Sequence, residues 1–300
     1  MQYLAIDIGG TYIKCGLLSQ DAQIIQEWKV QTPGTLKDFQ TIVGAQIQKY
    51  ETEVAGIAFS IPGTVYPQSK LMQDGQEIYY LKNLPLKTWM KTLTTKPWSM
   101  IDDGNAVALA ENWKGNLHQV AHGAAVVLGT GVSSGLIINH ELYQGSNLQA
   151  GETGLLFASL SVTKTPATTY AQLCSAVQFM SHATQLLNTD SNDSVTVFAA
   201  LAQGNHHELT ELFRNYCKDI ARLLATLQII LDVEKIVLGG GISQQQLLIE
   251  EVKKQYSLLW EEETFGMMLS HVDIEACFFA SSAQLVGALR YLLIQHFNEQ

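Results

Sequence analysis

The sequence lacks the features that mark membrane, secreted or zinc-binding proteins. No stretch of about eighteen residues is apolar and free of charge, as a membrane-spanning helix requires. The N-terminus, MQYLAIDIGG, has neither the basic segment nor the apolar core of a signal peptide. The four cysteines lie far apart, with no CxxC or Cys/His spacing. We therefore expect a cytoplasmic chain with reduced cysteines and no membrane partner.

Basic residues are also scarce. The chain has 18 Lys and Arg against 28 Asp and Glu, which gives a net charge of -10. Proteins that bind nucleic acids neutralise phosphates with many Lys and Arg side chains, so we expect no nucleic-acid partner. A single nucleotide is not excluded, because backbone amides and a metal ion can hold a triphosphate. The 300 residues, 47% of them hydrophobic, are enough for two domains.

Short apolar runs separated by turns open the chain. The first thirty residues contain three such runs, YLAIDI, YIKCGLL and IIQEWKV. They predict an antiparallel meander, since glycines at positions 9 and 10 reach the backbone angles of a tight turn. Apolar residues at helical spacing over 36–50 and a buried strand over 54–60 follow.

A similar order returns from about residue 123, where an apolar run, a Gly/Thr turn and two further strands precede long helical patterns. The repetition predicts an α/β chain with two similar halves. We expect a small N-terminal α/β domain over 1–115, completed by a C-terminal helix over 282–300. The larger α/β domain is expected over 116–281.

Glycine-rich turns carry the first chemical signal. Asp7 ends the first apolar run, directly before the Gly9–Thr11 turn. Backbone N–H groups and a hydroxyl in such a turn can approach phosphate oxygens, and a strand-end carboxylate can hold Mg²⁺ through water. A plain hairpin, with Asp7 bonding the turn, is the alternative. The Gly129–Gly131 turn repeats the pattern without the acid, and two such turns together favour a polyphosphate clamp.

A third glycine run, Gly239–Gly241, follows another apolar strand. Its small residues suit close approach of a base or ribose to the backbone. A glycine turn capped by Ser243 is the alternative. The run does not have the GxGxxG spacing of a dinucleotide-binding fold.

Taken together, several segments resemble the ROK family of repressors, open reading frames and kinases. DIGGTYIKCGLL, SIPGTV, IDDGNAVALAE, GTGVSSGLI with AGETG, and IVLGGGIS occur in the family's order and approximate spacing. The resemblance implies two ribonuclease-H-like domains of the actin-like, hexokinase-like ATPase type, with ATP and sugar in the cleft between them. It also implies a homodimer, and 116–281 is the expected dimerisation domain.

The resemblance assigns site residues position by position. It places the phosphates of ATP and Mg²⁺ at Asp7 (Mg²⁺, through water), Gly9, Gly10, Thr11 and Lys14. The second phosphate loop would be Gly129, Thr130 and Gly131, with the adenosine beside Gly239, Gly240 and Gly241. The sugar pocket would be lined by Pro62, Gly63, Asp102, Asp103, Asn105 and Glu152.

Two adjacent acids, Asp102 and Asp103, precede an Ala-rich helical run. From the residues alone, an Asp at this position is a helix N-cap. The resemblance implies that Asp103 is also the catalytic base, which takes the proton from the attacking sugar hydroxyl. Phosphoryl transfer mostly requires alignment and charge neutralisation, so one rigidly held carboxylate suits this task.

The chain departs from the family pattern at the sugar site. The usual motif of the GEIGH type reads GETGLLFA, with Leu155 at the His position, and no cysteine cluster follows. We therefore expect no zinc site, and a preference for a β-glucoside or related hexose, since β-glucoside kinases share both departures. Asp102 replaces a usual Asn and either tunes the sugar preference or raises the pKa of its neighbour.

A further departure is Ser133-Ser134, where glycines are common; these hydroxyls remain open to phosphate binding.

The sequence thus predicts an ATP- and Mg²⁺-dependent sugar kinase that phosphorylates the 6-hydroxyl of a hexose or β-glucoside. Cellobiose, glucose, fructose and N-acetylmannosamine are all candidate acceptors. The alternative is a catalytically weak sugar-binding regulator without a DNA-binding domain. Repressors of the family carry a helix-turn-helix segment before the first strand, which begins here at Tyr3, so we do not expect DNA binding.

Overall fold

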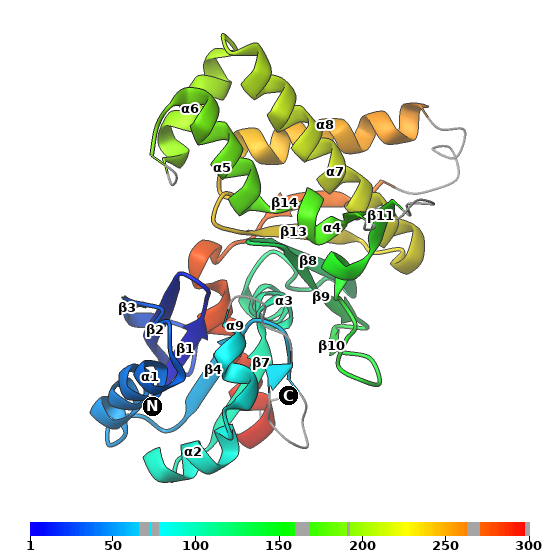
Figure 1. Cartoon of the computed structure of the whole chain (residues 1–300). Coiled ribbons are helices and arrows are strands. Elements are labelled where there is room, and N and C mark those ends of the chain that lie inside the picture. The colour runs from blue at the N-terminus through cyan, green and yellow to red at the C-terminus, as the bar shows by residue number, and fades with distance from the viewer. Residues whose placement is uncertain (66–71, 74–77, 160–167, 191–192, 263–270, 298–300) are drawn as a thin grey trace.

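Two five-stranded sheets organise the chain (Figure 1). The computed structural model describes residues 1–65, 72–73, 78–159, 168–190, 193–262 and 271–297. The strands follow the order β3-β2-β1-β4-β7 in the first sheet and β10-β9-β8-β13-β14 in the second. Each sheet consists of a three-stranded antiparallel meander followed by two parallel strands. This repetition confirms the predicted α/β class and the two similar halves.

Strands of the first sheet come from the first third of the chain. They are β1 (Gln2–Ile8), β2 (Tyr12–Ser19), β3 (Ile24–Gln31), β4 (Ile57–Ile61) and β7 (Trp98–Asp102). Central β1 is buried on both faces. Leu4 and Ile6 join one apolar cluster, with α1 (Leu36–Tyr50) and α2 (Leu86–Leu93), whereas Tyr3 and Ala5 join another.

The second sheet repeats this arrangement. Its strands are β8 (His122–Leu128), β9 (Val132–Ile138), β10 (Glu141–Tyr143), β13 (Lys235–Gly240) and β14 (Asp273–Ala276). On one face it packs against α4 (Tyr170–Leu173), α5 (Ala176–Leu187), α6 (Ser194–Gln203), α7 (His207–Leu231) and α8 (Gln246–Glu262).

Shorter elements lie in the connections. They are β5 (Thr64–Val65), β6 (Met72–Gln73), β11 (Phe157–Ser159), β12 (Thr168–Thr169) and the 3₁₀ helices η1 (Tyr79–Asn83), η2 (Thr153–Leu155) and η3 (Ala280–Ser282).

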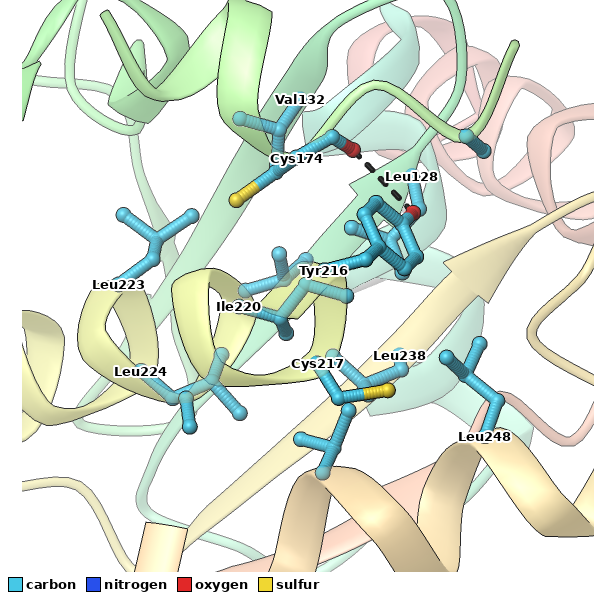
Figure 2. Close-up of a cluster of buried hydrophobic side chains, with 14 of the residues drawn as sticks. Leu128, Val132, Cys174, Tyr216, Cys217, Ile220, Leu223, Leu224, Leu238 and Leu248 are labelled. Carbon is cyan, nitrogen blue, oxygen red and sulfur yellow. Dashed lines mark hydrogen bonds between the residues drawn. The ribbon is translucent and has the colours of Figure 1, made fainter. Parts of the chain in front are cut away.

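The core of the second half contains two of the buried cysteines (Figure 2). Cys174 and Cys217 lie among leucine, isoleucine and valine side chains, and the Tyr216 hydroxyl donates to the Cys174 carbonyl oxygen at 3.3 Å. All four cysteines are free and buried. Burial raises the pKa of the Cys15 thiol to about 12, so this thiol stays protonated and serves packing. Among the helices of the described residues, none combines the length and the apolar character that a membrane span requires.

Helices α3 (Asp103–Lys114) and α9 (Ala283–His296) lie between the two sheets (Figure 1). Helix α9 packs against β1, β4 and β7 of the first sheet, and α3 packs against α9 and against β8 and β9 of the second. Glycines allow the backbones to touch. A Cβ at Gly287 would overlap the carbonyl oxygen of Ala106, and a Cβ at Gly135 would overlap that of Gly104.

The C-terminal helix is shorter than the sequence suggested. It begins at Ala283 and ends at His296, rather than spanning 282–300, and residues 298–300 lie outside the described ranges. The domain boundary between 115 and 116, and the role of 116–281 in dimerisation, remain predictions.

The close contact between α3 and α9 predicts that a larger residue at position 287 destabilises the fold. We expect Gly287→Ala to lower the free energy of unfolding by about 3 kcal/mol or more, because the new methyl group overlaps backbone that cannot move aside. Gly34→Ala is the matched control, since a Cβ at Gly34 would have no heavy atom within 4 Å. Urea titration of both variants measures the difference. Equal stabilities would contradict the packing described above.

Candidate functional site

The β1–β2 turn is a tight hairpin that leaves its tip accessible. The Gly9 amide donates to the Tyr12 carbonyl oxygen at 3.1 Å, and the Thr32 hydroxyl donates to the Gly9 carbonyl oxygen at 2.6 Å. Gly10 and Thr11 are exposed at the tip. The turn therefore presents a held backbone and an exposed Thr11 side chain at its tip.

Asp7 lies beside this turn, within β1, and its side chain is largely buried. Its neighbour across the sheet is Lys14, whose Nζ lies 3.8 Å from Asp7 Oδ2 and donates to the Ser281 carbonyl oxygen at 2.8 Å. Burial raises the pKa of the Asp7 carboxyl, while the Lys14 charge opposes that rise. Lys14 thus connects the first hairpin to the segment that leads into α9.

The β8–β9 turn is the counterpart in the second sheet. The Gly129 amide donates to the Gly131 carbonyl oxygen at 3.0 Å, and Thr130 is exposed. The N-terminus of α5 lies against this turn, because the Ala176 amide donates to the Gly129 carbonyl oxygen at 2.9 Å. The space beside Gly129 is open, since a Cβ at this position would have no heavy atom within 4 Å.

The third glycine run lies at the end of β13, beside the end of β8. Gly240 has a φ of +105°, and a Cβ there would overlap the carbonyl oxygen of Leu128. Gly241 is exposed, with no heavy atom within 4 Å of a built Cβ. The Ser243 hydroxyl donates to the Gly240 carbonyl oxygen at 2.9 Å, within the turn that follows β13. Helix α8 begins only at Gln246.

At the start of α3 the two adjacent acids take different positions. Asp102 is the N-cap, and its carboxylate accepts from the Asn105 backbone amide at 2.9 Å and from the Asn105 side-chain amide. Asp103 is the first helical residue, and its Oδ1 accepts a hydrogen bond from the Ser133 hydroxyl at 3.0 Å. The cap interaction belongs to Asp102 and leaves the Asp103 carboxylate directed towards β9.

Both carboxyls titrate far above the ordinary range of aspartate. Burial, together with the charges of Asp102 and Asp7, raises the pKa of Asp103 to about 7. Burial, with a smaller contribution from Glu152, raises the pKa of Asp102 to about 6. Asp103 is therefore poised to exchange a proton near neutral pH, as a general base must.

A pocket opens between the two halves of the molecule at this point. Its lining combines residues of both halves, namely Gly63, Asp102, Asp103, Asn105, Ser133, Ser134, Leu148, Ala150, Gly151 and Glu152. Five of the six residues expected to bind sugar are among them, and Pro62 is not. The phosphate and adenosine residues expected from the sequence do not line it.

Asn105 offers the pocket an unused acceptor. The residue is 1% exposed, and its Oδ1 has no hydrogen-bond partner among the residues that the structure describes. Its amide nitrogen is directed to Asp102 instead. A buried oxygen without a partner is costly unless a ligand donor satisfies it.

Several pocket residues were not among the expected site residues. Ser133 had been considered for phosphate binding, but its hydroxyl bonds to Asp103, and the Ser134 hydroxyl shares a hydrogen bond of 2.7 Å with that of Thr153. Gly151 has a φ of +94°, and a Cβ there would overlap the Ser134 carbonyl oxygen. In the sequence, only the glycine at position 151 of the AGETG motif indicated this close approach of two backbone segments.

Glu111, at the other end of α3, is a second missed residue. It is fully buried, and its carboxylate accepts backbone N–H bonds from Asn116, Phe278 and Phe279 at 2.8, 3.1 and 3.2 Å. It ties the helix to the segment between β14 and α9. A glutamate near the end of an Ala-rich helix does not indicate, from sequence alone, that it binds backbone amides more than 160 residues away.

Leu155, which stands where the family's zinc-site histidine is expected, is exposed to solvent. Leu155 ends η2 and is 70% exposed. Across the described ranges, no three His, Cys, Asp or Glu side chains are grouped so as to hold a metal ion.

The sequence and the fold were compared with those of known proteins. A family model described as the ROK family matches residues 3–294. A β-glucoside kinase of Listeria monocytogenes is 28% identical over 300 residues, 98% of each chain. An N-acetylmannosamine kinase of Escherichia coli is 24% identical over 95% of this chain and 96% of its own. The crystal structure of a ROK family protein from Streptococcus pneumoniae in complex with sucrose superposes with a TM-score of 0.83, at 26% identity and 100% coverage of both chains.

The raised pKa values also make a stability prediction. Because the folded state binds protons to Asp103 more tightly than the unfolded state, stability falls as pH rises from about 4 to about 7. We expect Asp103→Asn to melt about 5 °C above the wild type at pH 8, and at nearly the same temperature at pH 4. Asp21→Asn, at an exposed turn carboxyl, is the control and should show no such dependence. If the melting temperatures of Asp103→Asn and the wild type differ by the same amount at pH 8 and at pH 4, burial does not destabilise the ionised Asp103 carboxylate.

Proposed function

The chain belongs to the ROK family, and from this premise we propose that it is an ATP-dependent sugar kinase with Asp103 as the general base. The position of Asp103 carries the assignment. Its carboxylate lines the pocket, and it lies close enough to Asp7, beside the first hairpin, for the Asp7 charge to raise its pKa. In this proposal the base would lie between the acceptor pocket and the first phosphate loop.

The reaction follows from this placement. The acceptor hydroxyl gives its proton to the ionised Asp103 carboxylate while its oxygen forms a bond to the γ-phosphorus. The bond from that phosphorus to the bridging oxygen breaks, and ADP leaves with the electron pair. Asp103 starts the step deprotonated, which its pKa of about 7 allows at neutral and higher pH.

We assign the phosphates to the two hairpins, with Gly9, Gly10, Thr11 and Lys14 on one side and Gly129, Thr130 and Gly131 on the other. Gly239, Gly240 and Gly241 are assigned to the adenosine. Mg²⁺ held by Asp7 through water would neutralise phosphate charge. Asp7 suits a cation because the residue is only 7% exposed and its ion pair with Lys14 spans a long 3.8 Å.

For the acceptor we propose a β-glucoside such as cellobiose, or a related hexose, phosphorylated at the 6-hydroxyl. Asp102, Asn105 and Glu152 supply acceptors for sugar hydroxyls around the pocket, beside Gly63. The β-glucoside kinase relative supports this choice, as does Leu155 in place of histidine. Glucose, fructose and N-acetylmannosamine remain alternatives, the last because of the N-acetylmannosamine kinase relative. We further propose that the kinase is a cytoplasmic homodimer formed through residues 116–281.

Removing the base tests the mechanism. We expect Asp103→Asn to keep sugar affinity but to lose about a thousandfold in kcat, because the neutral amide cannot accept the proton. Coupled measurement of ADP release gives kcat, and calorimetry gives the sugar Kd. Asp21→Asn should match the wild type in both. A kcat near that of the wild type would remove Asp103 from the role of base.

A sugar panel tests the substrate. We expect sugar-dependent ADP release, with the highest kcat/KM for cellobiose or another β-glucoside among cellobiose, glucose, fructose and N-acetylmannosamine. A higher value for N-acetylmannosamine would overturn the choice of substrate but not the kinase activity. Binding without ADP release on every sugar would instead favour the regulator.

A further inference from the structure

Strand β9 presents two consecutive hydroxyls to two different walls of the pocket. Ser133 donates to the Asp103 carboxylate of α3 at 3.0 Å, and Ser134 shares a hydrogen bond of 2.7 Å with Thr153, next to Glu152. Consecutive side chains of a strand point to opposite faces, so the two serines reach different elements. One short segment of the second sheet therefore contacts both carboxylate-bearing walls.

The Ser133 contact supplies something that the helix cap does not. The Asp102 cap fixes the backbone at the start of α3, but the Asp103 carboxylate can still rotate about its own side-chain bonds. In the described ranges, Ser133 is the one side chain that donates a hydrogen bond to this carboxylate. A bond to Oδ1 limits the rotation and leaves Oδ2 for another partner.

We propose that Ser133 is a positioning residue for phosphoryl transfer, which holds Asp103 Oδ1 so that Oδ2 faces the acceptor hydroxyl. This inference rests on the proposed kinase function. It assigns the Ser133 hydroxyl to the base rather than to the phosphates, so that a residue of the second sheet aligns a base at the start of α3.

The charges around Asp103 sharpen the argument. Asp102 from β7 and Asp7 from β1 both disfavour its ionised form, and the nearby charge of Lys14 from β2 is paired with Asp7. Glu152 acts on Asp102. Two hydrogen bonds favour the ionised carboxylate, one from the Ser133 hydroxyl and one from the Gly104 backbone. Loss of the Ser133 bond therefore affects both the orientation and the charge of the base.

Three variants separate positioning from general structural damage. Ser133→Ala removes the hydroxyl. Ser133→Thr keeps it on a residue that suits a strand. Ser134→Ala removes the neighbouring hydroxyl, which contacts Thr153 rather than Asp103. Each is assayed for kcat, for the KM of the best acceptor sugar, and for the acid limb of the pH profile of kcat/KM.

We expect Ser133→Ala to lower kcat about tenfold to a hundredfold, with the sugar KM within about twofold of the wild type. The acid limb should move to higher pH by about one unit, since the ionised base has lost its donor. Ser133→Thr should restore both, and Ser134→Ala should leave the acid limb in place.

Two results would overturn the inference while leaving the kinase function intact. One is a wild-type kcat and acid limb in Ser133→Ala. The other is an equal shift of the limb in Ser134→Ala, which would indicate a general disturbance of β9. A wild-type protein that phosphorylates no sugar would instead contradict the proposed function, and with it the premise of the inference.

Discussion

Direct backbone contacts hold α3 in place between the two halves of the molecule. The helix lies between β9 and α9, and glycines at 135 and 287 let both neighbours reach its carbonyl oxygens without intervening side chains. Because Asp103 is the first residue of this helix, the same contacts fix the proposed base. Any displacement of either neighbour would move the wall of the pocket with it.

Buried or half-buried carboxylates hold both ends of this helix. Asp102 caps the N-terminus through Asn105, and Glu111 binds the segment before α9 near the C-terminus. The two anchors are costly, since burial raises the pKa of both carboxyls. Each cost is offset by backbone donors that would otherwise lack partners. The helix is thus held by its ends and along its length, as a rigid support for chemistry should be.

Sequence reasoning recovered the parts of the molecule governed by local pattern. Glycine turns between alternating apolar runs predicted both hairpins, and the repeated order predicted the two sheets. It could not tell which of the two adjacent acids caps α3, because residue type does not show which carboxylate turns back onto the helix. Nor could it pair Ser133 with Asp103, thirty residues apart and on different elements. Contacts of that kind depend on how the two halves pack, which no local pattern encodes.

The place of α9 has a consequence for how the protein is made. The helix covers β1, β4 and β7, which precede it by some 180 residues or more, and its side chains complete an apolar cluster that includes Tyr3 and Ala5. On the ribosome, the first sheet therefore emerges long before the helix that covers it. Domains usually fold as their residues emerge, N-terminal first. Here the first sheet must wait through some 180 further residues for the helix that covers its apolar face.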